Sequence, residues 1–378
     1  MTLFKRILCA LTALAVLAAF SACKQAEKSS TQNESPKEDT VVNTYAKTRV
    51  KLDKNTKGIK ILGVRNLESS AFINADWSCS GIEFYADCEG TLSLNVMSDK
   101  PCYYRAYVDE KPYMNGESPY FTVDGNSSIE IGSIERGTHL FRFVKATGFT
   151  LANTSIRSLT LCGLISQEAP RDNDLYLEFV GDSICCGWGV LPDENGAYNG
   201  SYKCQDSTLA YPYLIASELK ADYSVTALSG QGLFVGDPGI IKGYKYASPL
   251  KNTEQEYSFE RKPSAVIVNV GTNDYYQKTD KGITEDAYTQ ALVSFLSLIR
   301  EKNTATCKII VVYNVMNDTF SKGTQKAVSE LGGESNGFYL FCAKRTSGER
   351  GNTHPSINEN AVYAKAIGNY IKQILEIE

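Results

Sequence analysis

The sequence predicts an all-β sandwich followed by a three-layer α/β/α domain, with a parallel sheet between two layers of helices. From about residue 46 to residue 170 the chain has only strand patterns, separated by turn residues. From residue 171 to residue 378, short apolar strands alternate with helical patterns. Short strands at regular spacing are typical of a β-sandwich, and strands that alternate with helices are typical of a covered parallel sheet.

The N-terminal half contains five segments in which residues alternate or are enriched in β-branched and aromatic types. These segments are residues 59–62, 81–86, 91–96, 104–108 and 140–144. Turn-forming residues lie at 87–90, 124–126 and 136–137, and we expect the chain to turn there. This half lacks a helical period, which favours a sandwich.

The C-terminal half begins after the polar stretch at 170–174, which is the expected domain boundary. Strands are expected at 175–180, 223–228, 265–270 and 308–313, and helices at 209–219, 285–302 and from Ser356 onward. Apolar residues lie on one face of the last two helices, and Ser356 is the expected N-cap of the last one. Ligands of such sheets bind at the carboxyl ends of the strands, so functional residues are expected in the loops that follow strands.

The first 45 residues are expected to lie outside the folded parts. Residues 1–22 join a short basic region to an apolar run that is too short for a membrane span, as in a secretory signal. The run ends in Phe20-Ser21-Ala22-Cys23, which resembles the lipobox of bacterial lipoproteins. Residues 23–45 are polar, and we expect a lipidated Cys23 followed by a flexible tether. The expected product is an exported bacterial lipoprotein, anchored in the periplasm or at the cell surface; the alternative is a plain secretory signal with an incidental cysteine.

Charge and cysteine content exclude some functions. The net charge of −4 leaves no basic footprint, so we expect no nucleic-acid partner. Cysteines without a Cys-x-x-Cys pair and partnering histidines make a zinc site unexpected. Nine of the 11 cysteines follow Cys23, and an odd number cannot all pair. A disulfide among Cys185, Cys186 and Cys204 stays open for an exported chain.

A serine and a histidine in the C-terminal half are the candidates for nucleophilic chemistry. Ser183 follows the first strand of this half in the motif Gly181-Asp182-Ser183-Ile184. A serine hydroxyl is a weak nucleophile and needs a base to accept its proton. The chain has two histidines, and only His354 lies in this half, in the loop before the last helix. His139 lies among the strands of the other half and is expected to be structural.

Two further motifs supply donors for an oxyanion. Gly230 follows one predicted strand in Ser229-Gly230-Gln231-Gly232, and Asn273 follows the next in Gly271-Thr272-Asn273-Asp274. A glycine N–H and an asparagine amide both donate well to a developing oxyanion. The predicted oxyanion hole therefore consists of the backbone N–H groups of Ser183 and Gly230 and the side-chain amide of Asn273.

The order of these four motifs resembles the SGNH, or GDSL, hydrolase superfamily. The stretch 179–190 is similar to the nucleophile block of carbohydrate esterase family two, and Val108-Asp109 and residues 137–145 look like the sandwich that precedes it. The resemblance covers about residue 58 to the end. It implies a jelly-roll sandwich before a flavodoxin-like SGNH domain. It also implies an acetyl xylan esterase-like serine esterase that removes O-acetyl groups from carbohydrate through an acyl-enzyme, without metal or organic cofactor.

The chain departs from this superfamily at one position. An aspartate usually lies three residues before the histidine, whereas this chain has Gly351 there. A backbone carbonyl that accepts from the imidazole is the preferred substitute, and Glu349 is the alternative. Trp188 is interpreted either as a platform for sugar or as core, and Tyr275 and Tyr276 are further candidates for substrate binding.

Two other functions remain in competition with the esterase. A glycan O-acetyltransferase would share the acyl-enzyme and differ only in the acceptor. A non-catalytic carbohydrate-binding lipoprotein would be consistent with the missing aspartate. Against that, a decayed site has no reason to keep a serine, a glycine, an asparagine and a histidine at strand ends.

Overall fold

The computed structural model describes residues 45–67, 69–193, 195–248, 255–316, 320–344 and 354–378. The predicted signal, Cys23, almost all of the predicted tether, Glu349 and Gly351 lie outside the described residues. By its contacts, Thr44–Glu378 forms one unit. Among the described helices, none is long and apolar enough to cross a membrane.

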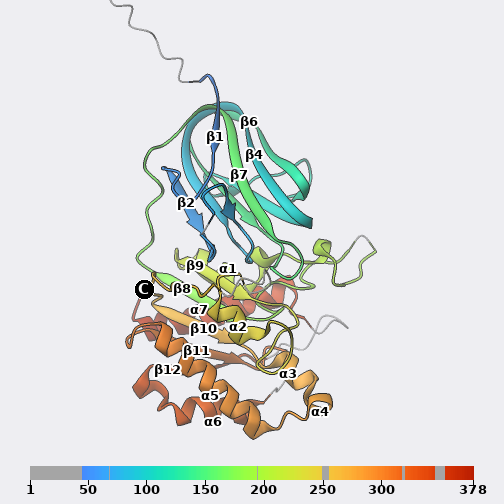
Figure 1. Cartoon of the computed structure of the whole chain (residues 1–378), viewed down its shortest axis with the longest axis vertical. Coiled ribbons are helices and arrows are strands. Elements are labelled where there is room, and N and C mark those ends of the chain that lie inside the picture. The colour runs from blue at the N-terminus through green and yellow to red at the C-terminus, as the bar shows by residue number, and fades with distance from the viewer. Residues whose placement is uncertain (1–44, 68, 194, 249–254, 317–319, 345–353) are drawn as a thin grey trace, which may run out of the picture. The chain divides into compact units, whose positions relative to one another are not determined.

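The first part of the chain forms a seven-stranded antiparallel sheet (Figure 1). Its strands are β1 (Lys47–Lys51), β2 (Ile59–Leu62), β3 (Ile73–Asn74), β4 (Gly81–Val108), β5 (Lys111–Pro112), β6 (Phe121–Lys145) and β7 (Thr154–Ile165). Phe141 of β6 pairs with Phe84 on one side and with Val108 on the other, so β4 curls until both of its ends flank β6. The curled sheet encloses an apolar core, and the prediction of an all-β N-terminal part is confirmed.

The turns predicted at 87–90, 124–126 and 136–137 are wrong, because β4 and β6 run through them. The pairing of the two strands shifts register on either side of Gly90, which has a φ of 76°. Such a shift is a β-bulge, which bends a strand without reversing it and which needs the same positive φ as many turns. Gly90 therefore marks a bend that lets β4 curl, and not a turn that ends the strand.

The second part contains a five-stranded parallel sheet in the order β12-β11-β10-β8-β9. The strands are β8 (Tyr176–Gly181), β9 (Asp222–Ala227), β10 (Ala265–Asn269), β11 (Lys308–Tyr313) and β12 (Phe338–Cys342). After β9 the chain crosses back over β8 to form β10, so the strand order reverses at β8. Doubly wound sheets bind ligands at such a reversal, beyond the carboxyl ends of the strands.

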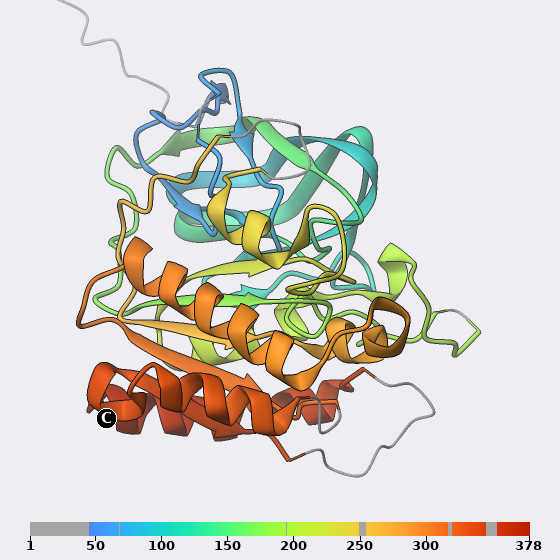
Figure 2. The ribbon, with the colours of Figure 1, turned by 60° about the horizontal axis from the view of Figure 1, so that its bottom comes forward.

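Helices cover both faces of this sheet, so the predicted three-layer class is confirmed. Helices α1 (Tyr211–Glu218) and α7 (Ile357–Leu375) pack on the face that carries Phe179 and Ile267. Helices α2 (Gly239–Lys245), α5 (Glu285–Lys302) and α6 (Ser321–Glu330) pack on the opposite face. Figure 2 shows α5 lying across that face of the sheet. Short helices α3 (Thr272–Tyr276) and α4 (Lys278–Lys281) follow β10, and 3-10 turns span Tyr202–Cys204, Ser207–Leu209 and Gly333–Asn336.

The antiparallel part contacts the parallel sheet along β9. Ser78 forms an isolated antiparallel bridge with Val225 of β9. The Trp77 indole N–H donates to the carbonyl of Ala247 (3.1 Å), and the Ser207 N–H donates to the carbonyl of Ala146 (2.7 Å). Because these contacts satisfy buried polar groups, the two parts support each other around the loops that follow β8 and β9.

Candidate active site

Three of the four sequence motifs begin at the same edge of the parallel sheet. Gly181 at the end of β8 is level with Ala227 of β9 on one side and with Asn269 of β10 on the other. The loops that carry Ser183, Gly230 and Asn273 therefore leave the sheet side by side. The strand order reverses at this edge, and functional residues are expected in the loops that follow its strands.

Ser183 lies in a tight turn that follows β8 directly. The N–H of Trp188 donates to the carbonyl of Ser183 (3.1 Å), and the N–H of Cys186 donates to that of Asp182 (3.2 Å). Gly181 must lack a side chain, because a Cβ there would lie 2.4 Å from the Cys185 sulfur. Ser183 is nearly buried, with 5% of its surface exposed, so its hydroxyl faces a narrow opening.

His354 lies beside Ser183 although 171 positions separate them in the chain. The distance from His354 Nε2 to Ser183 Oγ is 2.8 Å, which is a hydrogen bond. Burial lowers the pKa of His354 from 6.5 to about 4. The imidazole is therefore neutral near pH 7 and able to accept a proton.

The start of α7 holds the loop that carries His354. Ser356 caps the helix as predicted, in a capping box with Glu359, whose N–H donates to the Ser356 hydroxyl (3.1 Å). The amide of Asn360 donates to the carbonyl of Pro355 (3.2 Å), and its oxygen accepts from the N–H of Tyr211 at the start of α1 (3.0 Å). Sequence reasoning missed Asn360, because its contact with Tyr211 joins residues that are 149 positions apart in the chain.

The predicted oxyanion donors lie in the two neighbouring loops. Gly230 is exposed, with a φ of 77°, and has open space where a side chain would project. The Asn273 amide nitrogen donates to the carbonyl of Gln231 (2.8 Å) and to a carboxylate oxygen of Asp182 (3.2 Å). Asn273 therefore ties its own loop to the nucleophile turn and to the Gly230 loop.

Two buried aspartates stabilise these loops. Asp182 accepts from the N–H of Ile184 (3.0 Å) within the nucleophile turn. Burial raises its pKa to about 7. The carboxylate of Asp274 accepts from the N–H groups of Leu233 (2.9 Å) and Phe234 (2.8 Å), just after Gly230. Burial also raises the pKa of Asp274.

The aromatic candidates differ in their surroundings. Trp188 is half-buried, and Gly200 lies so close to its ring that a Cβ there would be 2.8 Å from it. Tyr275 packs against Phe320 (ring centroids 5.5 Å apart), whereas Tyr276 is 55% exposed. Sequence reasoning missed Phe234, which is 45% exposed in the Gly230 loop. Its position, four residues after Gly230, could have marked it as an aromatic residue near the site.

The remaining sequence predictions concern the cysteines, His139, the partner of His354 and a metal site. All nine cysteines in the described part of the chain are unpaired, so the open question of a disulfide among Cys185, Cys186 and Cys204 is answered in the negative. His139 bonds to the carboxylate of Asp109 (2.8 Å) in the antiparallel sheet. The choice between a backbone carbonyl and Glu349 as the partner of His354 lies outside the described residues. Where the chain is described, no three His, Cys, Asp or Glu side chains could hold a metal ion together.

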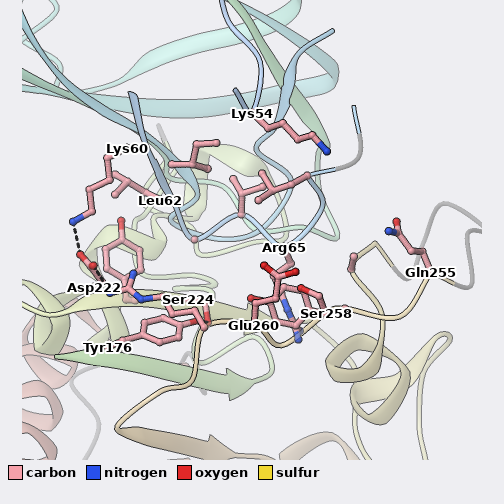
Figure 3. Close-up of a pocket in the computed structure, with 18 of the residues that line it drawn as sticks. Lys54, Lys60, Leu62, Arg65, Tyr176, Asp222, Ser224, Gln255, Ser258 and Glu260 are labelled. Atoms are coloured by element: carbon pink, nitrogen blue, oxygen red, sulfur yellow. Dashed lines mark hydrogen bonds and ion pairs between the residues drawn. The ribbon is translucent and has the colours of Figure 1, made fainter. Parts of the chain in front are cut away.

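A cleft of about 610 Å³ lies at the opposite edge of the parallel sheet (Figure 3). It is lined by Tyr176 and Asp222, the first residues of β8 and β9, so it opens at the amino ends of the strands. Within it, Asp222 forms ion pairs with Lys60 (2.7 Å) and Arg261 (2.5 Å). This cleft is separate from the site around Ser183.

Residues 179–340, which include the Ser183, Gly230 and Asn273 loops, match the sequence profile of the GDSL-like Lipase/Acylhydrolase family. These residues form a GDSL-like lipase/acylhydrolase domain. The match begins in β8 and ends in β12, so the GDSL-like domain coincides with most of the parallel sheet.

Two characterised relatives carry sequences similar to the GDSL-like domain and beyond. The cellulase/esterase CelE of Acetivibrio thermocellus is 29% identical over 211 residues, which is 53% of this chain. The chain spans only 24% of the length of CelE. The acetylxylan esterase / glucomannan deacetylase of Cellvibrio japonicus is 23% identical over 323 residues, which is 80% of this chain and 86% of that protein.

Solved structures of family two carbohydrate esterases share the whole fold. A family two carbohydrate esterase from Clostridium thermocellum in complex with cellohexaose matches with a TM-score of 0.76, 23% identity and coverage of 84% of this chain and 99% of its own. The acetyl xylan esterase Est2A of Butyrivibrio proteoclasticus matches with a TM-score of 0.73, 20% identity and coverage of 88% and 99%. The GDSL-like domain and the antiparallel sheet before it therefore form the fold of these esterases.

Proposed function

We propose that this protein is a serine esterase that hydrolyses O-acetyl esters of carbohydrate through an acyl-enzyme. The observation that carries the proposal is the 2.8 Å hydrogen bond between Ser183 Oγ and the neutral imidazole of His354, at the switch point of a GDSL-like domain. The names of both curated relatives describe esterases, which favours hydrolysis over the transfer of the acyl group to a glycan.

The reaction proceeds in two steps. His354 Nε2 accepts the proton of Ser183 while Oγ attacks the ester carbonyl, and the same imidazole then protonates the departing sugar hydroxyl. In the second step His354 takes a proton from water, whose oxygen attacks the acetyl-serine. The bond between the acetyl carbon and Ser183 Oγ breaks, acetate leaves, and the imidazolium returns the proton to Oγ. The N–H groups of Ser183 and Gly230 and the amide of Asn273 stabilise the oxyanion in both steps. The Asn273 amide donates two hydrogen bonds, and the longer one, to Asp182, is the one that the oxyanion would replace.

The substrate proposed is acetylated polysaccharide or oligosaccharide of the xylan or glucomannan type. This class comes from the relative named acetylxylan esterase / glucomannan deacetylase, which aligns with most of the chain. Trp188, Tyr276 and Phe234 are the aromatic residues proposed to contact sugar around Ser183.

The experiment that tests this function measures acetate release from acetylated xylan and acetylated glucomannan, with and without a cello-oligosaccharide acceptor. We expect free acetate in both conditions and no acetylated acceptor. Transfer of acetyl to the acceptor in preference to water would replace the esterase with the acetyltransferase. Labelling of Ser183 by a fluorophosphonate without acetate release from any glycan would overturn the substrate class and keep the nucleophile.

The pH dependence of kcat/KM follows from the pKa of His354. A general base must be neutral to act, and burial lowers the pKa of His354 to about 4. Activity on 4-nitrophenyl acetate should therefore change less than about twofold between roughly pH 5.5 and 7, where an unshifted histidine would lose most of its activity. Asp182, with a pKa of about 7, is the other group near Ser183 that titrates in this range. If the pH profile of kcat/KM is the same in Asp182→Asn, the loss of activity at low pH is due to His354. If the activity of that variant falls with a midpoint near pH 6.5, the prediction is wrong.

We also infer that the chain is an exported lipoprotein tethered to a membrane through Cys23. The support is the sequence Phe20-Ser21-Ala22-Cys23 after an apolar run, followed by a polar stretch. Wild-type protein expressed with radiolabelled palmitate should carry label and sediment with membranes, and Cys23→Ala should do neither. Unlabelled wild-type protein, or a Cys23→Ala variant that still carries label, rules this anchor out.

A further inference from the structure

Three tyrosines from distant parts of the chain, one of them in the GDSL-like domain, pack ring against ring and are named here the tyrosine cluster. Tyr103 lies in β4, Tyr120 immediately precedes β6, and Tyr202 begins the 3-10 turn Tyr202–Cys204. The rings of Tyr103 and Tyr120 stack with centroids 4.8 Å apart, and Tyr202 meets Tyr103 edge to face at 5.0 Å. All three side chains are half-buried, so part of the cluster faces solvent.

The loop that supplies Tyr202 starts at the nucleophile. Trp188 closes the Ser183 turn, and Gly200 packs against its ring from two residues before Tyr202. The returning chain is held to the turn by the N–H of Leu191, which donates to the carbonyl of Cys204 (3.2 Å). Trp188 and Tyr202 therefore belong to one folded-back loop that begins at Ser183, and Tyr202 links this loop to the other two tyrosines of the cluster.

A buried carboxylate holds the cluster in place. The Tyr120 hydroxyl donates to Asp206 Oδ2 (2.8 Å), and Asp206 has no exposed surface. Arg105 Nη1 approaches the same oxygen (3.4 Å), while the other oxygen accepts from the N–H of Thr208 (2.8 Å). Rings that are fixed before a ligand arrives lose little conformational entropy when they bind it.

From this arrangement we propose that the tyrosine cluster binds sugar units of an extended, neutral polysaccharide, beyond the acetylated sugar at Ser183. Tyrosine combines a flat apolar face with a polar tip, which suits the apolar faces and hydroxyl rims of a sugar chain. The inference rests on the proposed function and deepens it: the substrate is polymeric, and both parts of the fold contact it. We expect the activity on a small ester, which binds only at Ser183, not to depend on the cluster.

The test compares kcat/KM on acetylated xylan with kcat/KM on 4-nitrophenyl acetate in Tyr202→Ala, Tyr103→Ala and Tyr202→Phe. We expect the ratio of polymer to small-ester activity to fall about two- to tenfold in each alanine variant and to be restored in Tyr202→Phe, which keeps the ring. Tyr85→Ala is the matched control, because Tyr85 is an exposed tyrosine of the same strand β4 that lines a different cleft. Equal losses on both substrates, or an unchanged ratio, overturn the proposal.

A binding measurement separates this inference from the esterase proposal. Ser183→Ala cannot form an acyl-enzyme, so its retardation in native gels that contain xylan reports binding alone. Retardation that weakens in Ser183→Ala/Tyr202→Ala supports the cluster even if the protein releases no acetate. Equal retardation of the two variants refutes it even if the esterase proposal holds.

Discussion

Ser183→Ala and His354→Ala should each lower kcat/KM on 4-nitrophenyl acetate by roughly 10³-fold or more. Ser183→Ala removes the atom that attacks the ester, and His354→Ala removes the acceptor 2.8 Å away. Because the two groups act on the same proton, the double variant should be no slower than the worse single variant, within about threefold. Initial rates with active-site titration and the midpoint of thermal unfolding separate a chemical loss from a folding loss.

The matched control for this prediction is the other histidine of the chain. His139→Ala removes an imidazole that bonds to Asp109 and to the carbonyl of Glu135 within the antiparallel sheet. Its kcat/KM should stay within about twofold of wild type. Retention of more than about a tenth of wild-type activity in Ser183→Ala or in His354→Ala would falsify the proposed pair.

Arg65→Met should lower the free energy of unfolding by about 3–5 kcal/mol. The Arg65 side chain is 1% exposed, and its guanidinium lies 4.0 Å from Glu178 in β8, which is 2% exposed. It also donates to the carbonyl of Tyr244 (2.8 Å) and to the hydroxyl of Thr226 (3.1 Å). Methionine keeps the apolar volume and leaves both the Glu178 carboxylate and the Tyr244 carbonyl without this donor.

Urea denaturation measures this loss, and two further variants assign its cause. Arg157→Met, on an exposed arginine of β7, should cost less than about 1 kcal/mol. Arg65→Met/Glu178→Gln should recover part of the loss, because the neutral amide has a smaller burial penalty than an unpaired carboxylate. If Arg65→Met and Arg157→Met are equally stable, the buried pair of Arg65 and Glu178 does not stabilise the fold as predicted.

Most elements of the parallel sheet could be predicted from local patterns. Helix α5 and strand β11 have the predicted bounds, 285–302 and 308–313, and β8, β9 and β10 begin or end within one residue of theirs. These segments are apolar over their whole length or along one face, which is a local property. Strand β12 and helices α2 and α6 were not predicted; β12 is a half-exposed edge strand, and α2 and α6 mix glycine and lysine with few apolar residues.

The antiparallel sheet was harder to predict, because its geometry depends on long-range pairing. The positive φ of Gly90 (76°) is compatible with a turn as well as with a bulge. Only the pairing of Phe141 with both Phe84 and Val108 distinguishes these outcomes. The pairing in turn depends on the burial of side chains contributed by strands far apart in the chain.

Local sequence alone was enough to propose Ser183, Gly230, Asn273 and His354 as candidates, because each stands next to a strand or helix whose ends are marked by short-range patterns. Local sequence also predicted the fold class of each half, which is all-β for the first and three-layer α/β/α for the second. The closeness of Ser183 to His354, the shifted pKa of that imidazole and the edge-to-face contact of Tyr103 with Tyr202 depend instead on the packed chain. Distances and desolvation arise between residues remote in sequence, and no local pattern encodes them.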